Sequence, residues 1–353
     1  MNQRVRFASS VFWSYVQSLS ARGISLVAFI VLGLYVGPAE FGLYALVSAL
    51  LMFVELVCEQ AMSQSLVQIA QTTQKQLEAV FVSALFLGLF FTVSLLLGAP
   101  QLARWFGQPD LLPLLRLAAV CPLLIAAVAV PVGLLKREQR FKVLARRTVT
   151  ASAISSVLGI SLVIAGLGAV GLLAQAVCYY AVSLWILWRH CDWRPTLRLR
   201  GIADGLPEIA QLSLANLGHK LSDFAETRGV ELLVGAMAGI QVLGAFAFAS
   251  KIAQAAFQTL VSPALEVVFV RAARVGSGAS TLEVIRTGQL LVGTVPAAGL
   301  LWLSLAAEPL LSVVYGERWA EAAAPLRILA VACLLRSLLY VFGAALLERR
   351  ATI

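Results

Sequence analysis

Charge is what this sequence has least of. Only 13% of its 353 residues are Asp, Glu, Lys or Arg, and 60% are hydrophobic. A typical soluble domain is about 25% charged, so this little charge could not cover the surface of a soluble protein of this length. Apolar runs of about 20 residues match helical spans, and barrel strands would alternate instead. The sequence therefore predicts an all-α, polytopic transmembrane bundle.

Cysteines and aspartates are few and scattered. The five cysteines form no C-x-x-C pair, so we expect neither a disulfide framework nor a zinc site. The four aspartates form no D-x-D pair of the kind that holds a metal and a nucleotide. The net charge is +9, but no basic run with interleaved aromatics indicates nucleic-acid binding. We expect no catalytic residues, no metal, no cofactor and no nucleic-acid partner.

Ten stretches are long and apolar enough to span a bilayer, and turn residues such as Gly37-Pro38 and Gly166-Leu167-Gly168 separate them. The first stretch is interrupted by polar residues and has no cleavage site of small residues, so we expect a retained span and not a signal peptide. The expected spans are 11–34, 42–65, 79–98, 113–134, 148–166, 169–188, 209–234, 241–263, 288–307 and 325–347.

Lysine and arginine are distributed very unevenly between the connections. One alternate set of connections and termini holds 18 of them, whereas the other set holds only Arg104 and Arg318. Cytoplasmic loops carry the Lys/Arg excess in membrane proteins. We therefore expect both termini in the cytoplasm.

A weak internal repeat indicates two lobes. Residues 37–46 recur at 239–248, and residues 113–120 recur from Pro325 onward, in the same order. Each match joins spans of the same direction, so the repeat is parallel. We expect a six-helix lobe over 1–189, a basic cytoplasmic linker over 190–208, and a four-helix lobe over 209–353.

Ionisable groups within spans are the best candidates for a binding site, because each costs about 2.5–3.5 kcal/mol at mid-depth. Deep cations suit an anionic substrate such as a pyrophosphate. Two alternatives stay open: small polar residues can join helices, and Lys220–Asp223 and Arg228–Glu231 can pair within one helix. The expected cavity residues are Arg22, Glu55, Glu59, Lys220, Asp223, Arg228, Lys251 and Arg336.

Several segments, in order along the chain, resemble one transporter family. They are Arg22-Gly-Ile-Ser-Leu, Val36-Gly-Pro-Ala-Glu-Phe-Gly-Leu-Tyr, Glu59-Gln-Ala-Met-Ser-Gln, Pro131-Val-Gly-Leu-Leu-Lys-Arg-Glu-Gln-Arg-Phe, Val230-Glu-Leu-Leu-Val-Gly, Leu243-Gly-Ala-Phe and Tyr315-Gly-Glu-Arg-Trp-Ala-Glu. Together they resemble the polysaccharide (Wzx-type) flippases of the MOP exporter superfamily, over nearly the whole chain.

The resemblance implies a protein of a bacterial inner membrane, with two lobes that alternate access around a cationic cavity. It implies a flippase whose cargo is an undecaprenyl-pyrophosphate-linked oligosaccharide for cell-surface polysaccharides such as O-antigen or exopolysaccharide. Membrane lipids, a polysaccharide polymerase and a chain-length regulator are the implied partners. Two features depart from the family: Glu231 stands where an Asp is expected, and ten spans stand where at least twelve are expected. We therefore expect an incomplete second lobe.

Three other functions are compatible with the residues. A drug or a lipid-linked peptidoglycan precursor could be the cargo of the same fold, although five deep cations argue against a drug exporter that relies on acidic residues. An inactive truncated product is the second alternative. An integral membrane enzyme of polysaccharide synthesis is the third, and the longest expected outer connection, 308–324, is short for a polymerase.

Overall fold

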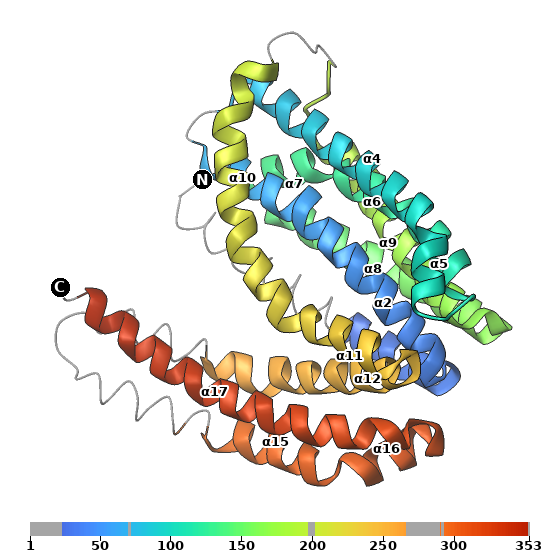
Figure 1. Ribbon diagram of the computed structural model, residues 1–353. Helices are drawn as coiled ribbons and strands as arrows, with labels where there is room; N and C mark the ends of the chain where they lie inside the picture. The colour runs from blue at the N-terminus through green and yellow to red at the C-terminus, as the bar shows by residue number, and fades with distance from the viewer. Residues whose placement is uncertain (1–22, 70–71, 197–201, 266–289, 291–292, 352–353) are drawn as a thin grey trace. The chain divides into compact units, whose positions relative to one another are not determined.

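The computed structural model describes residues 23–69, 72–196, 202–265, 290 and 293–351. These residues are almost entirely helical, and no strand occurs among them (Figure 1). They divide into two compact units, residues 1–240 and 241–353. The expected all-α class is confirmed.

Six described helices are long and apolar enough to cross a membrane, and a bent pair makes a seventh. The six cover Pro38–Gln68, Gln74–Trp105, Leu111–Arg137, Phe141–His190, Ile240–Leu265 and Glu317–Tyr340. The chain is thus a multi-pass membrane protein. The division into lobes of six and four helices stays a prediction.

The first unit consists of helices linked by short turns, with π-helical turns inside several of them. Its elements are a helix over Gly23–Tyr35, α2 (Pro38–Glu55), η1 (Leu56–Ala61), α3 (Met62–Gln68), α4 (Gln74–Trp105), α5 (Leu111–Ala118), α6 (Cys121–Ala126), α7 (Ala129–Arg137), α8 (Phe141–Leu162), η2 (Val163–Leu167), α9 (Gly168–His190), α10 (Ile202–Phe224), η3 (Ala225–Gly229) and α11 (Val230–Ala238).

Two helices of this unit begin with clear local signals. Pro38 is at the start of α2, and the Gly37 backbone N–H donates to Glu40 Oε2 at 3.3 Å. Thr73 caps α4: its hydroxyl accepts from the Gln76 backbone N–H at 3.3 Å, and its own N–H donates to Gln76 Oε1 at 2.9 Å. Such caps satisfy backbone donors that the first helical turn leaves unpaired.

Helices α8 and α9 form a hairpin that was expected as two spans. The chain reverses at Gly166 (φ 89°) and Gly168 (φ 42°), where a side chain would be strained. The two helices then pack along each other. The Gly-Leu-Gly turn predicted from the sequence is confirmed.

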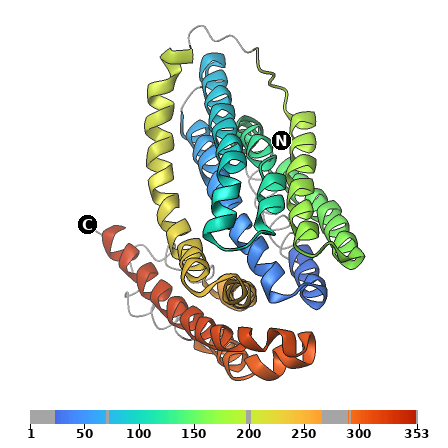
Figure 2. The ribbon, with the colours of Figure 1, turned by 45° about the vertical axis from the view of Figure 1, so that its right-hand side comes forward.

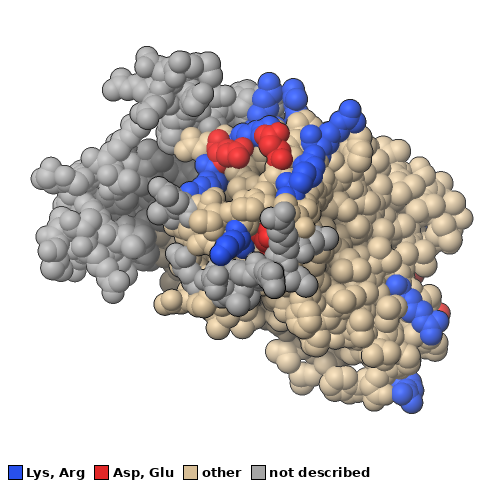
Figure 3. Space-filling model, turned by 90° about the horizontal axis from the view of Figure 1, so that it is seen from above, with Lys and Arg blue, Asp and Glu red and all other residues tan. Residues whose placement is uncertain are grey.

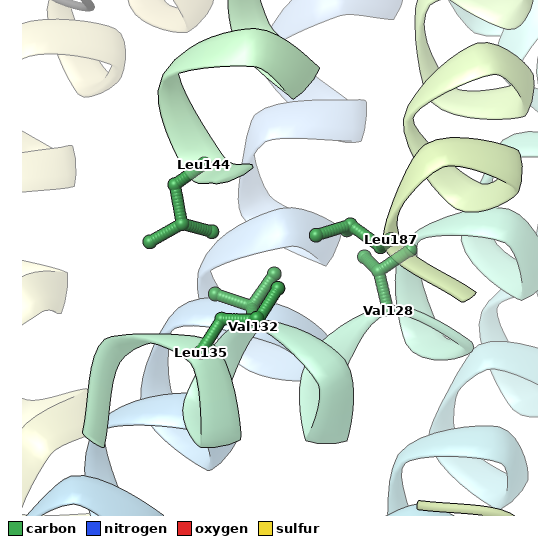
Figure 4. Packing of buried hydrophobic residues seen from close by; sticks show 5 residues of the cluster. All are labelled: Val128, Val132, Leu135, Leu144 and Leu187. Carbon is green, nitrogen blue, oxygen red and sulfur yellow. The ribbon is translucent and has the colours of Figure 1, made fainter. Parts of the chain in front are cut away.

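A small apolar core holds α7, α8 and α9 together. Figure 4 shows Val128, Val132 and Leu135 meeting Leu144 of α8 and Leu187 of α9. All five side chains are at least 95% buried. This packing determines where the polar residues that follow Leu135 and Leu144 in sequence are placed.

Helix α10 runs beside α4 in both views (Figures 1 and 2) and also packs on η1 and α3. It therefore closes one side of the space that η1, α7 and α8 leave between them. Its outward residues Leu214 and Leu221 are exposed, as expected for a surface that meets lipid.

The second unit contains α12 (Ile240–Ala256), η4 (Phe257–Val261), α15 (Val295–Leu305), α16 (Ala307–Tyr315), η5 (Glu317–Ala322) and α17 (Ala323–Ala351). Helices α15 and α16 are bent by 68° relative to each other. The expected connection 308–324 therefore holds α16 and η5. Trp319 explains the difference, because its ring is fully buried and stacks on Phe248 with centroids 3.7 Å apart.

Candidate functional site

A π-helical turn brings two carboxylates into the interior of the first unit. Glu55 ends α2, and Glu59 lies in η1, so the pair is four residues apart on one helical face. A π turn inserts an extra residue into a helix and is common at functional sites. Glu59 is only 6% exposed and Glu55 is half-buried.

A cavity of about 490 Å³ opens beside these carboxylates. Its volume lies within the range of about 300–1,000 Å³ that is usual for small-molecule sites. The lining is polar and comes from α2, η1, α3, α7, α8, α9 and α10. The lining residues are Glu55, Glu59, Gln60, Gln64, Val132, Lys136, Leu144, Arg147, Thr148, Tyr179, Asn216 and Lys220.

Arg147 of α8 and Glu59 of η1 lie next to each other in the wall of the cavity. Arg147 Nη2 and Glu59 Oε2 are 3.6 Å apart, and both side chains are about nine-tenths buried. Glu59 Oε2 and Arg147 Nε lack a hydrogen-bond partner among the described residues. Buried polar atoms are normally satisfied, so this pair has donor and acceptor capacity for a ligand.

Two lysines extend the positive charge of the cavity. Lys136 Nζ lies 3.5 Å from Ser63 Oγ, because α7 packs closely on α3 at Gly133. A Cβ on Gly133 would come within 2.9 Å of Leu66 Cδ1 and 3.1 Å of the Ser63 carbonyl oxygen, so any other residue would require α3 to shift. Lys220 reaches the cavity from α10.

Tyrosines form the wall next to Glu55. Tyr180 Oη donates a hydrogen bond to Glu55 Oε2 at 3.0 Å, and Tyr179 lines the cavity. Asn216, which also lines the cavity, exchanges two hydrogen bonds of 3.2 Å with Gln68, and these join α3 to α10. Hydroxyl and amide groups of this kind can bind sugar hydroxyls.

Charges gather at the end of the molecule where α4 and α10 begin. Figure 3, which looks onto that end, shows lysines and arginines close to a few acidic groups. The cavity itself brings Lys136, Arg147 and Lys220 together with Glu55 and Glu59. Three cations and two carboxylates leave an excess of positive charge, which favours an anionic ligand.

Three of the eight residues expected from the sequence lie around this cavity: Glu55, Glu59 and Lys220. Arg228 does not line it. Its Nη1 atom instead lies 2.7 and 2.6 Å from the two carboxylate oxygens of Glu231, the pairing that the sequence offered as an alternative.

The other four expected residues are placed differently. Arg22 lies outside the described residues, and Asp223 is in α10 with a side chain that is not described. Lys251 and Arg336 belong to the second unit. Arg336 Nη2 donates to Tyr340 Oη at 3.1 Å, and its guanidinium is 6.0 Å from the Phe257 ring centre.

Arg147 and Lys136 were not expected at the site, because the expected spans 113–134 and 148–166 place both in the connection between them, residues 135–147. The structure shortens that connection to Glu138–Arg140, since α7 ends at Arg137 and α8 begins at Phe141. A signal was available for Arg147. The buried small-residue face of α8, Ser155 and Ala151, continues by one further turn to position 147.

Comparison with known proteins agrees with the resemblance. Residues 31–324 match the model of a family described as "Polysaccharide biosynthesis protein". The succinoglycan biosynthesis transport protein ExoT of Rhizobium meliloti (strain 1021) is 23% identical over 323 residues, which cover 91% of this chain and 65% of the relative. The lipopolysaccharide biosynthesis protein WzxC of Escherichia coli (strain K12) is 23% identical over 365 residues, covering 99% and 71%.

Two groups of solved structures share the fold. The lipid II flippase MurJ in an inward closed conformation gives a TM-score of 0.72 at 11% identity, covering 96% of this chain and 76% of that one. A multidrug resistance MATE family transporter of the MOP superfamily, in an inward-facing conformation, gives 0.56 at 18% identity, covering 95% and 86%. The expected MOP-type fold is confirmed.

The family model spans most of the chain, from residue 31 to residue 324. The chain belongs to the polysaccharide biosynthesis protein family.

Proposed function

We propose that this protein is a flippase that moves an anionic, lipid-linked oligosaccharide across the bacterial inner membrane by alternating access. The observation that carries the proposal is the cavity of the first unit. There Lys136, Arg147 and Lys220 gather within a membrane-spanning bundle, beside two carboxylates. Cations at this position suit the diphosphate of an undecaprenyl-pyrophosphate carrier, since Arg and Lys bind phosphate oxygens with charge-assisted hydrogen bonds.

The relatives support transport over enzymatic synthesis. The Rhizobium relative is named as a transport protein for succinoglycan biosynthesis, and this chain spans 65% of its length. A polysaccharide polymerase and a chain-length regulator would be its partners.

The polar cavity wall suits the sugar end of such a cargo. Gln60, Gln64, Thr148, Tyr179 and Asn216 offer hydroxyl and amide groups next to the cations. A diphosphate at the cations would place the first sugar near these groups. We propose Glu55, Glu59 and Lys220, together with Lys136 and Arg147, as the substrate-binding residues of the first unit.

The deciding experiment is transport by a matched pair of variants in a strain that lacks its own polysaccharide flippase. Arg147 is buried at the cavity, whereas Arg146 is exposed and does not line it. The full-length protein and Arg146→Gln should restore surface polysaccharide, and Arg147→Gln should leave lipid-linked oligosaccharide on the cytoplasmic side. If both variants restored surface polysaccharide equally, the cavity residue Arg147 would not be needed for transport, and the proposal would be wrong.

The proposed orientation has its own test. Reporter fusions after Arg189 and Arg350 should give a cytoplasmic readout, and a fusion at Arg104 an external one, because the basic connections define the cytoplasmic side. An external readout at Arg189 would overturn the proposed orientation without bearing on the cavity.

A further inference from the structure

A second concave surface lies on α9, apart from the central cavity. Ala181, Leu184, Trp185, Trp188 and Arg189 line an open groove of about 500 Å³. These positions recur at helical spacing, so they form one stripe along the last turns of α9. The stripe runs about 12 Å from Ala181 to Arg189, at 1.5 Å per residue. It is apolar along its length and basic at its end.

The two tryptophans give the groove a defined shape. Trp188 donates its indole N–H to the Ala127 carbonyl oxygen at 3.0 Å, which holds the ring in place. Trp185 is 60% exposed, although it is a large apolar side chain. Tryptophan concentrates where the hydrocarbon of a bilayer meets the headgroups. Helix α9 ends at His190, one residue beyond the groove, which is where the headgroup level is expected.

Each indole has a guanidinium over it. The Arg189 guanidinium carbon is 5.3 Å from the Trp185 ring centre, and that of Arg194 is 5.7 Å from the Trp188 ring centre. An arginine over an aromatic face is held by cation–π attraction. Its N–H edges stay available for a phosphate, which arginine can bind in a bidentate manner.

The nearby carboxylates are already used elsewhere. Glu138 and Asp192 both lie 3.4 Å from Arg140. Arg194 donates to backbone carbonyls, including that of Trp193 at 2.9 Å. Across the described part of the chain, no ion pair joins Arg189 or Arg194 to a carboxylate. Three arginines (Arg140, Arg189 and Arg194) and two carboxylates (Glu138 and Asp192) thus leave a net charge of +1 at the end of the groove.

We propose that this groove binds one anionic phospholipid, with an acyl chain along Ala181, Leu184 and Trp185 and the headgroup phosphate at Arg189. Basic pockets beside transmembrane helices are recognised binding places for anionic headgroups. The site is separate from the central cavity, because the two share no lining residue. It requires only that the chain spans a membrane, so it does not rest on the proposed transport activity.

The test uses the full-length protein in a mild detergent, with native mass spectrometry to count bound lipids. The probes are phosphatidylglycerol and phosphatidylcholine with identical acyl chains. The wild type should retain one phosphatidylglycerol through delipidation, in preference to phosphatidylcholine. Arg189→Gln should lower that preference about fivefold, the ratio expected for one basic residue at an anionic surface. Trp185→Ala should weaken retention of both lipids.

Arg116→Gln is the matched control, because Arg116 is an exposed arginine on α5 that does not line the groove. It should retain phosphatidylglycerol as the wild type does. Arg189→Lys, which keeps the charge, provides the comparison if Arg189→Gln proves unstable, and it should retain most of the preference. Equal retention of the two lipids by the wild type, or an unchanged preference in Arg189→Gln, would overturn the proposal. Displacement of phosphatidylglycerol by a polyprenyl phosphate, but not by glycerol phosphate, would reassign the groove to the cargo's lipid tail and also overturn it.

Discussion

Two ion pairs of the first unit, Arg228–Glu231 and Arg147–Glu59, are both largely buried but are built differently. In the first, the partners are three residues apart on one continuous helix, and the shortest N–O distance is 2.6 Å. In the second, the partners come from α8 and η1, and the closest atoms are 3.6 Å apart. The first pair is closed, in that both oxygens of Glu231 contact Arg228 and only Arg228 Nε lacks a described partner. The second pair lines a cavity, and both Glu59 Oε2 and Arg147 Nε lack one.

The difference shows what each pair can do. A pair within one helix, in which one guanidinium nitrogen contacts both carboxylate oxygens, neutralises its own charge and needs no other element. A loose pair between elements depends on the fold and can exchange a partner for a ligand. We therefore expect that removing one partner lowers stability by a similar amount in both pairs. An anionic ligand should affect only the Arg147–Glu59 pair. The expected effects are given from the largest downward.

The largest effect should follow from removing one carboxylate. Glu59→Gln and Glu231→Gln each leave a buried guanidinium unpaired and should lower the free energy of unfolding by about 3–5 kcal/mol. Thermal unfolding of the purified protein measures this. Inorganic pyrophosphate should restore stability to Glu59→Gln only, because only Arg147 lines a cavity that an anion can enter. If pyrophosphate restored stability to both variants, the claimed difference in access between Arg147 and Arg228 would be wrong.

A transport assay should distinguish the buried Arg147 from its exposed neighbour Arg146. Arg147→Gln should reduce flipping of lipid-linked oligosaccharide in membrane vesicles about 100-fold, corresponding to about 3 kcal/mol for a lost buried charge contact. Arg146→Gln should change it less than twofold, since Arg146 is exposed. A similar loss in both variants would mean that net charge, and not position, matters.

The closed pair should be replaceable as a unit. The double variant Arg228→Gln/Glu231→Gln removes both charges together, and such replacements are often close to neutral for stability. It should retain most of the transport activity. If it loses activity while remaining folded, Arg228 takes part in cargo binding, as the sequence alone suggested.

A small effect is expected at the amide pair between α3 and α10. Gln68→Ala and Asn216→Ala should each lower stability by about 0.5–1.5 kcal/mol, because each removes the same two exposed hydrogen bonds. The double variant should be no worse than either single one. Additive losses in this double-mutant cycle would show that the two residues act independently.

Features that depend on residues close together in the chain could be predicted from the sequence, whereas contacts between distant residues could not. Spans were predictable because about 20 consecutive apolar residues are a local property, and the hairpin turn was predictable because Gly166 and Gly168 follow each other closely. The Arg228–Glu231 pair was predictable because its partners share a helix. Lys136 and Arg147 were not, because charged residues at the end of an apolar run look the same whether they face solvent or an interior cavity.

The sequence by itself thus determined the helical, membrane-spanning class of this protein, its family and several of the charged residues within spans, since composition, periodicity and local spacing carry that information. The tertiary structure alone decided which charges meet. Glu59 and Arg147 are 88 positions apart in the chain and come into contact only because α7 packs on both η1 and α8 and so brings these two elements together. Sequence spacing has no bearing on a contact of that kind, because the packing of side chains between helices determines it.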